Sequence, residues 1–191
     1  MEPQQFSPQQ SLELIQNMIS KTKADISGNR FYFLLWGWIA LIGILGQYIL
    51  KVIIVYEHHY AIWLITFVGT VVSIIYTVKR DARQKARTYV ADNMSYLWTG
   101  LGVGFFVLII IFTKIGWQYA YPFFILFYGM GTFISGKILQ FPPLIIGGIF
   151  NWALSAASVF FHFDHQMLFA AAAIITSYLI PGYLLKSKTN G

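Results

Sequence analysis

Six apolar stretches, each close to the roughly 20 residues that a helix needs to cross a bilayer, make up most of this 191-residue chain. Apolar side chains account for 57% of the residues and charged side chains for 10%, whereas soluble domains carry about 25% charged residues. Inside lipid, a helix is the structure in which such a stretch satisfies its own backbone hydrogen bonds. The sequence therefore predicts an all-α protein, a polytopic bundle of six transmembrane helices.

The predicted membrane domain covers residues 31–185, between a polar N-terminal segment (1–30) and a short tail (186–191). The expected spans are 31–50, 60–78, 96–112, 119–138, 142–161 and 166–185. The link 113–118 is so short that the helices on either side of it should be antiparallel neighbours. The spans would form three successive hairpins. Leu35-Trp36-Gly37-Trp38 and Leu97-Trp98-Thr99-Gly100 open the first two in a similar way, which leaves an internal repeat open.

The basic residues fall unequally on the two sides that these spans imply. Only Lys51 and Lys114 lie on one side, and the other eleven of the thirteen Lys and Arg residues lie opposite. Because short cytoplasmic loops are rich in Lys and Arg, both termini should be cytoplasmic, in a multi-pass protein of the plasma (inner) membrane. These cations would meet lipid headgroups, so the net charge of +6 does not indicate a nucleic-acid partner.

The N-terminal segment has the pattern of an amphipathic helix at residues 7–27. Ser7-Pro8-Gln9-Gln10 suits a helix start, and Leu12, Ile15 and Met18 follow at helical spacing. Such a helix either lies on the membrane surface or docks onto a soluble protein. Together with the basic loop 79–87, it is the expected contact for a cytoplasmic protein partner.

Residue types that carry catalysis or ion coupling are missing from the predicted spans. All seven acidic side chains, and every Lys, Arg and His, fall outside the middle of the predicted hydrocarbon. Ion-coupled pumps usually carry an ionisable group there, and the sequence has no paired carboxylates and no phosphate-binding glycine loop. We therefore expect that the chain is not an enzyme, and no cofactor is evident.

Glycine and proline collect in the half of the spans nearer the cytoplasm, in the blocks 97–104, 128–136, 141–148 and 180–183. Small residues four positions apart, such as Gly100/Gly104 and Gly131/Ser135, let helix backbones approach each other. Pro181 frees a carbonyl one turn back, and freed groups are tolerated where they line protein or water. Close packing and a cytoplasm-facing cavity are both compatible with this pattern.

A polar stripe follows one face of the fifth span, where polar or small residues succeed one another at three- and four-residue steps from Gly147 onward. A buried amide such as that of Asn151 needs hydrogen-bonding partners, which we expect from the first or last span. The candidate residues of this seam or ligand cavity are Gln47, Asn151, Ser155, Ser158, Thr176 and Ser177. The stripe is either a polar seam between helices or a path for a small polar solute.

All four histidines fall on the outer side, in two loops that also carry carboxylates. Imidazole and carboxylate groups are ordinary ligands of zinc, nickel and copper. The candidate ligands for a divalent transition metal are His58, His59, His162, Asp164 and His165. No strict metal-binding motif is present.

Four blocks carry a resemblance to known proteins: 33–38, 128–133, 143–148 and 180–183. They resemble a family of small, uncharacterised bacterial inner-membrane proteins with a polar, amphipathic N-terminal helix and six spans. The resemblance extends over the whole chain. It implies a bacterial plasma membrane and brings no activity, catalytic residue or cofactor with it.

Three functions follow as hypotheses. The first is an accessory or regulatory membrane component that acts through a partner. The second is a small-solute or lipid transporter with a cytoplasm-facing cavity, based on the glycine and proline blocks and the Asn151 stripe. The third is a metal-binding membrane protein that uses the outer histidines. An oligomer is compatible with each of them, and the sequence fixes no symmetry.

Overall fold

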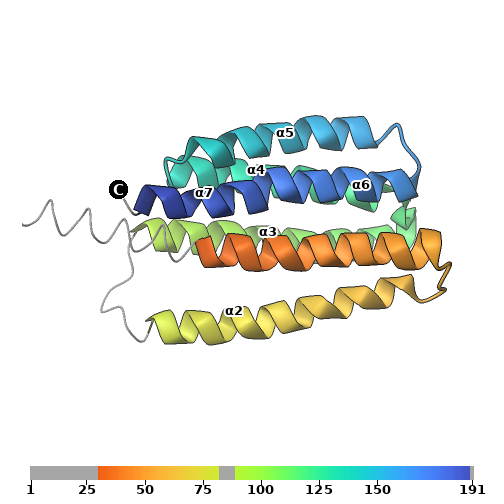
Figure 1. Ribbon diagram of the computed structural model, residues 1–191, viewed down its shortest axis with the longest axis horizontal. Helices are drawn as coiled ribbons and strands as arrows, with labels where there is room; N and C mark the ends of the chain where they lie inside the picture. The colour runs from red at the N-terminus through yellow and green to blue at the C-terminus, as the bar shows by residue number, and fades with distance from the viewer. Residues whose placement is uncertain (1–29, 82–88, 190–191) are drawn as a thin grey trace, which may run out of the picture.

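The computed structural model describes residues 30–81 and 89–189, and these residues form a bundle of long helices with no strand (Figure 1). The first helix is Arg30–Ile53, and its last turn has π geometry (η1, Ile49–Ile53). It is followed by η2 (His59–Leu64), which continues into α2 (Ile65–Asp81), and then by α3 (Tyr89–Ile115), η3 (Trp117–Tyr119), α4 (Ala120–Ile138) and α5 (Pro142–Ser158). The last helix consists of α6 (Phe163–Ile174), η4 (Ile175–Leu179) and α7 (Ile180–Thr189) in succession. The prediction of an all-helical protein is confirmed. Residues 7–27 and 82–87 of the expected partner contact lie outside the described residues.

Four of these helices are long and apolar enough to cross a membrane: Arg30–Ile53, His59–Arg80, Tyr89–Ile115 and Phe163–Leu185. The predicted fourth and fifth spans coincide with α4 and α5, which are shorter and contain glycine and proline. These two helices bury many of their residues against the rest of the bundle. Helices that pack against protein can place small and polar residues at the contact, as these two helices do.

Helix boundaries differ from the predicted spans mainly where a helix continues into polar sequence. α3 begins at Tyr89 rather than 96, and α7 continues to Thr189 through the segment predicted as a tail. Backbone hydrogen bonding continues a helix beyond its apolar stretch, so apolar runs underestimate helix length. Pro181 does not break the last helix, because the π-helical turn η4 precedes it and absorbs the irregular bonding.

α4 and α5 pack in very close contact, and glycines make this possible. A Cβ built on Gly148 would lie 2.7 Å from the Phe133 backbone nitrogen and 2.8 Å from the Gly129 carbonyl oxygen. A Cβ built on Gly136 would lie 2.7 Å from the backbone nitrogen of Ile145. The short turn before α4 places α3 and α4 as the expected antiparallel neighbours, with Gly116 at a φ of 99°.

α2 lies on the opposite side of the bundle from α5 (Figure 1). It is attached to the Arg30–Ile53 helix by a hydrogen bond of 2.6 Å between the hydroxyls of Tyr32 and Thr77 and by stacking of Phe31 on Tyr76 with ring centroids 3.8 Å apart. Only 6% of its most apolar stretch is buried. This exposed surface must face lipid or another protein.

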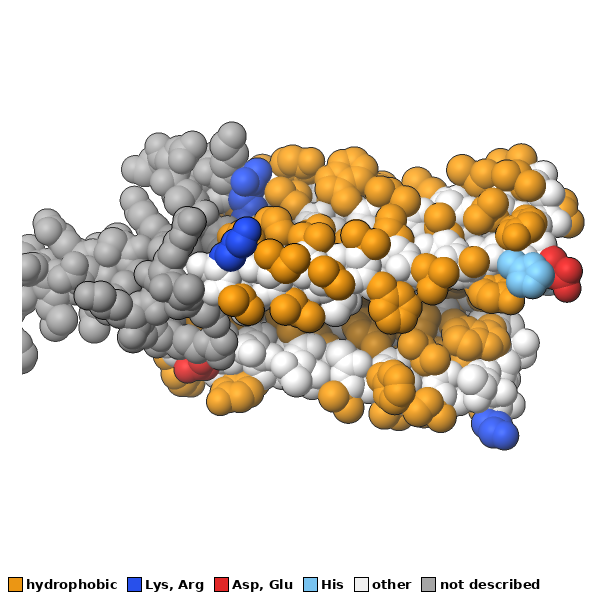
Figure 2. All heavy atoms as spheres, turned by 90° about the horizontal axis from the view of Figure 1, so that it is seen from below, with side chains coloured by type: hydrophobic (Ala, Val, Ile, Leu, Met, Phe, Trp, Pro, Cys, Tyr) orange, Lys and Arg blue, Asp and Glu red, His pale blue; other side chains and the backbone are white. Residues whose placement is uncertain are grey.

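Figure 2 shows hydrophobic side chains along the length of one face, with Lys and Arg side chains near the ends of the bundle. In the described residues, Arg30, Lys79, Arg80 and Lys137 lie at the same end of the helices, and Lys51 and Lys114 lie at the other. An apolar band between charged ends is the surface expected of a membrane protein.

Candidate ligand cavity

A cavity of about 470 Å³ lies where the Arg30–Ile53 helix, α2 and α3 meet, near the end of the bundle that carries Lys79 and Arg80. It is lined by Tyr32, Phe33, Trp36, Thr77, Arg80, Ala91, Met94, Ser95, Trp98, Thr99, Gly102, Phe105, Tyr128 and Tyr178. Sites for small organic molecules typically enclose about 300–1,000 Å³ and are mainly apolar and aromatic. This cavity therefore has the size and lining of a small-molecule site.

Aromatic rings in mutual contact form the inner wall of the cavity. The Tyr178 ring centroid lies 5.4 Å from that of Phe33, 6.0 Å from that of Trp98 and 5.3 Å from that of Tyr128. Phe105 continues the series, with its centroid 5.0 Å from that of Tyr128. Edge-to-face and tilted pairs at these separations are favourable and hold the rings in place. The wall is thus a fixed apolar surface contributed by four helices.

The Tyr178 side chain is almost completely buried, at 2% exposure. Its hydroxyl lies close to Thr132 but makes no hydrogen bond of ordinary geometry. The Thr132 hydroxyl donates to the Tyr128 carbonyl oxygen at 2.7 Å. A buried hydroxyl without a good partner costs free energy. The ring of Tyr178 therefore forms part of the wall, while its hydroxyl lies beside Thr132, outside the lining.

The end of the cavity near the α2 C-terminus is polar. The Arg80 guanidinium lies 5.7 Å from the centroid of the Tyr32 ring. Thr77 shares the α2 wall with Arg80, and Ser95 and Thr99 lie one turn apart on the α3 wall opposite. Since Thr77 already donates to the Ser73 carbonyl oxygen at 2.8 Å, Tyr32 is the donor in the bond between their hydroxyls. The cavity is therefore amphipathic, with one guanidinium near the α2 C-terminus and hydroxyls along the α2 and α3 walls.

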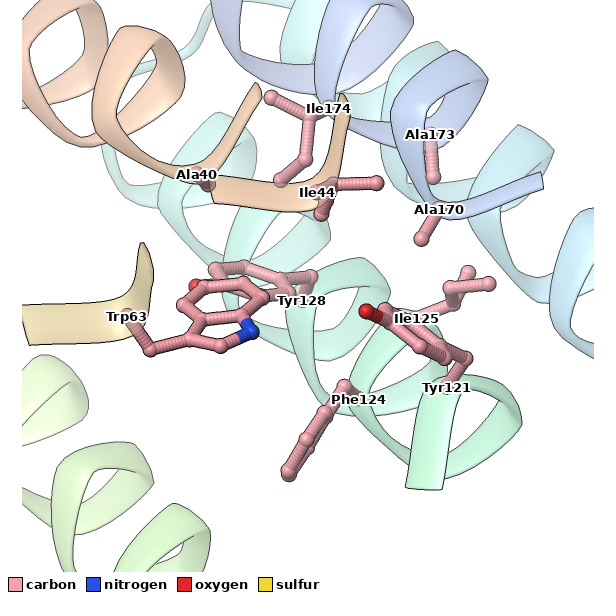
Figure 3. A pocket seen from close by; sticks show the side chains of 10 residues that line it. All are labelled: Ala40, Ile44, Trp63, Tyr121, Phe124, Ile125, Tyr128, Ala170, Ala173 and Ile174. Atoms are coloured by element: carbon pink, nitrogen blue, oxygen red, sulfur yellow. The ribbon is translucent and has the colours of Figure 1, made fainter. Parts of the chain in front are cut away.

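A second, much smaller cavity of about 30 Å³ lies among the Arg30–Ile53 helix, η2, α4 and α6 (Figure 3). Its volume suits about one water molecule, and nearly all of its lining is apolar. Tyr128 lines both cavities. Two residues that line the small cavity share a partner: Trp63 Nε1 and the Tyr121 hydroxyl both donate to Gln47 Oε1 at 2.7 Å. This region is a packed junction rather than a ligand site.

The polar stripe of α5 faces the interior of the bundle. Asn151 Nδ2 donates to Ser177 Oγ at 3.0 Å, Ser155 donates to the Pro122 carbonyl oxygen at 2.8 Å, and Ser158 donates to the Ser155 carbonyl oxygen at 2.8 Å. All three α5 side chains are buried, and none of them lines the large cavity. The stripe therefore has the geometry of a polar seam between α5 and its neighbours.

Two of the expected Asn151 partners lie elsewhere. Gln47 is occupied by Trp63 and Tyr121, and its Nε2 lies 3.2 Å from Nδ1 of His59. Thr176 donates to the Ala172 carbonyl oxygen at 2.9 Å within its own helix. Only Ser177 is in contact with the Asn151 amide. The spacing of the stripe indicated which face is polar, but it could not distinguish between neighbouring side chains of the last helix.

The candidate metal ligands of the two loops make other interactions. Asp164 forms an ion pair with Lys51, and His59 contacts Gln47. His58 packs against the rings of Tyr56 and Tyr60, and His162 and His165 stand at the start of α6. Within the described parts of the chain, no three His, Cys, Asp or Glu side chains lie close enough to hold a metal ion. Metal binding by these residues stays a prediction.

Sequence reasoning assigned the cavity residues to other roles. The sequence marks Trp36 and Trp98 only as similar openings of two hairpins, and Arg80 only as one of the basic residues that set the orientation. The similar positions of Trp36 and Trp98 at the start of two spans were the available signal, since both side chains line the cavity. The glycine block 97–104 was a second signal, because it contributes Gly102 to the lining.

Comparison of the chain with protein-family models, curated proteins and solved structures finds no match.

Proposed function

We propose that this protein is a six-span protein of a bacterial plasma membrane, with both termini in the cytoplasm, that binds a lipid-like small molecule in the cavity between the Arg30–Ile53 helix, α2 and α3. The single observation that carries the proposal is the cavity of about 470 Å³ with its contiguous aromatic wall. Aromatic surfaces of this kind bind hydrocarbon by removing apolar area from water or lipid headgroups.

Six crossings are supported by the lengths of the two inner helices. α4 has 19 residues and α5 has 17, which correspond to about 28 Å and 26 Å at 1.5 Å per residue. These lengths are close to the roughly 30 Å of bilayer hydrocarbon. Their antiparallel packing beside the longer helices favours a full crossing, because a helix that ended within the hydrocarbon would leave backbone groups unsatisfied.

The location of the cavity suits exchange of a ligand with the membrane. Its walls include the Arg30–Ile53 helix, α2 and α3, and α2 does not pack along α3. None of the described lining residues is a carboxylate or histidine that would take up a coupling proton. We therefore favour binding and passive exchange of the ligand over ion-driven transport.

The test is to fill the cavity with a large side chain at a lining position that has room for it. A Cβ on Gly102, which lines the cavity, would have no neighbour within 4 Å, and the same holds for Gly100, which does not line it. Gly102→Phe and Gly100→Phe are therefore matched variants on one helix. Each is purified in mild detergent, and the bound organic molecules are extracted and quantified by mass spectrometry.

We expect wild type and Gly100→Phe to retain the same compound at about one molecule per chain, as a single small-molecule site requires, and Gly102→Phe to lose it. Equal retention by the two variants would rule out this cavity as the binding site.

An accessory role through a protein partner is a second candidate. It is favoured by the exposed apolar surface of α2, where Phe67, Val71 and Ile74 are 68%, 55% and 57% exposed on one side of the helix. Such a surface suits a partner helix as well as lipid. A stoichiometric protein that co-purifies from native membranes, and is lost when these three residues become alanine, would support this role. Its retention would exclude α2 as the contact.

A further inference from the structure

We propose that the ligand of this cavity is an uncharged lipid of the quinone type, a flat ring that carries carbonyl oxygens and an apolar tail. The ring lies against the aromatic wall beside Trp98, and a carbonyl oxygen accepts hydrogen bonds from the hydroxyls of Ser95 and Thr99. The inference rests on the proposed binding function and adds the chemical class of the ligand.

Two hydroxyls on the α3 wall have no hydrogen-bonding partner in the described part of the chain. Ser95 and Thr99 line the cavity four residues apart, and so lie on one face of the helix. Six other threonines each donate to a carbonyl oxygen three or four residues back: Thr66, Thr70, Thr77, Thr113, Thr132 and Thr176. The hydroxyls of Ser95 and Thr99 are therefore available to a group inside the cavity.

Two indole N–H groups of the lining are available as well. Trp36 and Trp98 both line the cavity, and neither indole has a hydrogen-bonding partner among the described residues. Trp63, by contrast, donates to Gln47 at 2.7 Å. An indole N–H can only donate, and a hydroxyl can donate as well as accept. A lining with unused donors favours a ligand that brings acceptors, and a carbonyl oxygen, with two lone pairs, is such an acceptor.

This inner part of the cavity lies away from its mouth beside Arg80. A Cβ built on Gly69 would lie 3.7 Å from the Trp36 ring, and Gly69 precedes Arg80 by about 16 Å along α2. On α3 the lining continues inward from Trp98 to Phe105, without a charged residue. An ionised group would lose its hydration here without gaining a counter-ion, which is costly. The inner part therefore suits an uncharged ligand.

The aromatic wall favours a flat ring beside these donors. The Trp98 ring packs edge-to-face against Phe33 and Tyr178, with centroid separations of 6.3 Å and 6.0 Å. A further flat ring joins such a cluster through the same edge-to-face and offset contacts, which a flexible hydrocarbon chain cannot make. A quinone ring combines this shape with two carbonyl acceptors.

The tail can leave the cavity between α2 and α3. Ser95, Thr99 and Gly102 are exposed although they line the cavity, and α2 does not pack along α3. The volume of about 470 Å³ is in the lower half of the range for small-molecule sites. The cavity therefore has room for the ring and the first part of a tail, and the remainder of the tail lies in the hydrocarbon of the bilayer.

The test uses two tritium-labelled probes that differ only in the carbonyls. One is 2-methyl-1,4-naphthoquinone with a geranyl tail at position 3, and the other is the naphthalene with the same methyl group and tail. Binding to the immobilised full-length protein in mild detergent is measured by scintillation proximity. Specific binding is the part that Gly102→Phe abolishes.

The variants remove hydroxyls and keep the size of each side chain close to that of wild type. Ser95→Ala combined with Thr99→Val removes both free donors, whereas Thr99→Ser alone keeps a hydroxyl at each position. Thr113→Val is the matched control on the same helix, because the exposed Thr113 donates to the Ile110 carbonyl oxygen at 2.7 Å and does not line the cavity.

We expect wild type to bind the quinone roughly tenfold or more tightly than the naphthalene, as expected for two hydrogen bonds in a site of low polarity. Ser95→Ala with Thr99→Val should remove most of this difference and leave naphthalene binding unchanged, which also shows that the variant is folded. Thr99→Ser should bind both probes as wild type does, and so should Thr113→Val.

Equal affinity of wild type for the two probes would overturn the carbonyl-bearing class, and so would equal losses of quinone binding in the double variant and in Thr113→Val. If the quinone showed no specific binding while Gly102→Phe alone lost the native compound, the ligand class would be wrong and the binding function would stand. If Gly102→Phe and Gly100→Phe retained that compound equally, the proposed function itself would fail.

Discussion

At the scale of single residues, glycines in this bundle have very different surroundings. Gly148 is enclosed by the backbone of α4, whereas nothing lies within 4 Å of a Cβ on Gly100. Because backbone cannot move aside as a side chain does, Gly148→Ala should force α4 and α5 apart and destabilise the protein by about 1–3 kcal/mol. Gly100→Ala should be neutral or slightly stabilising, since alanine favours a helix over glycine.

Thermal unfolding of the detergent-solubilised variants, followed by circular dichroism, measures this difference. Gly148→Ala should unfold at a lower temperature than wild type, and Gly100→Ala should not. If both variants unfolded at the wild-type temperature, the close contact between α4 and α5 would be incorrect.

The sequence was informative about single residues only when their spacing determined their environment. The steps of three and four residues in α5 correctly indicated that Asn151, Ser155 and Ser158 share one buried face. They could not indicate which residue of the last helix meets Asn151, because rotation of a helix by one residue exchanges Thr176 for Ser177. Likewise, Gly100 has nothing within 4 Å of a Cβ and Gly148 is closely packed, but both residues are simply glycine in the sequence.

At the scale of helices, the two polar faces that the chain presents inside the bundle differ in access. Ser95 lines the large cavity on α3 and is exposed, whereas Ser155 on α5 is 7% exposed and bonded to the Pro122 carbonyl oxygen. The chain has no native cysteine. A water-soluble maleimide should therefore label Ser95→Cys and leave Ser155→Cys unmodified, as seen by the mass of the intact protein.

Labelling of both residues at similar rates would show that water reaches the α5 seam and would support a path for a small polar solute along it. Labelling of neither would mean that the α3 wall is closed in solution. Denaturation of the Ser155→Cys sample before labelling confirms that its thiol is intact.

The positions of the helices were largely predictable, whereas the cavity was not. Both outcomes follow from what an apolar run can indicate. Apolar runs locate helices because lipid and protein both favour apolar surface, but they do not distinguish these environments. α2 and α3 are both strongly apolar, yet α2 contacts mainly the Arg30–Ile53 helix and leaves space beside α3. That separation depends on contacts such as the hydrogen bond between Tyr32 and Thr77, which join distant parts of the chain.

At the scale of the whole molecule, the proposed six crossings depend on α4 and α5, the helices outside the set of four that are long and apolar enough by themselves. Lys114 and Lys137 lie at the ends of α3 and α4, and His162 immediately precedes α6. If α4 and α5 cross the bilayer, these three positions alternate between its two faces. A four-span protein in which neither helix crossed would place all three positions on one face.

Single cysteines at Lys114, Lys137 and His162 distinguish these arrangements in intact cells with a membrane-impermeant maleimide. We expect labelling at 114 and 162 from outside, and labelling at 137 only after the cells are opened, because Lys137 lies at the same end as the basic residues of α2. The inverse pattern would keep six spans but reverse the orientation, and so place Arg80 and the mouth of the cavity outside the cell. Equal labelling of all three positions would refute the crossings of α4 and α5.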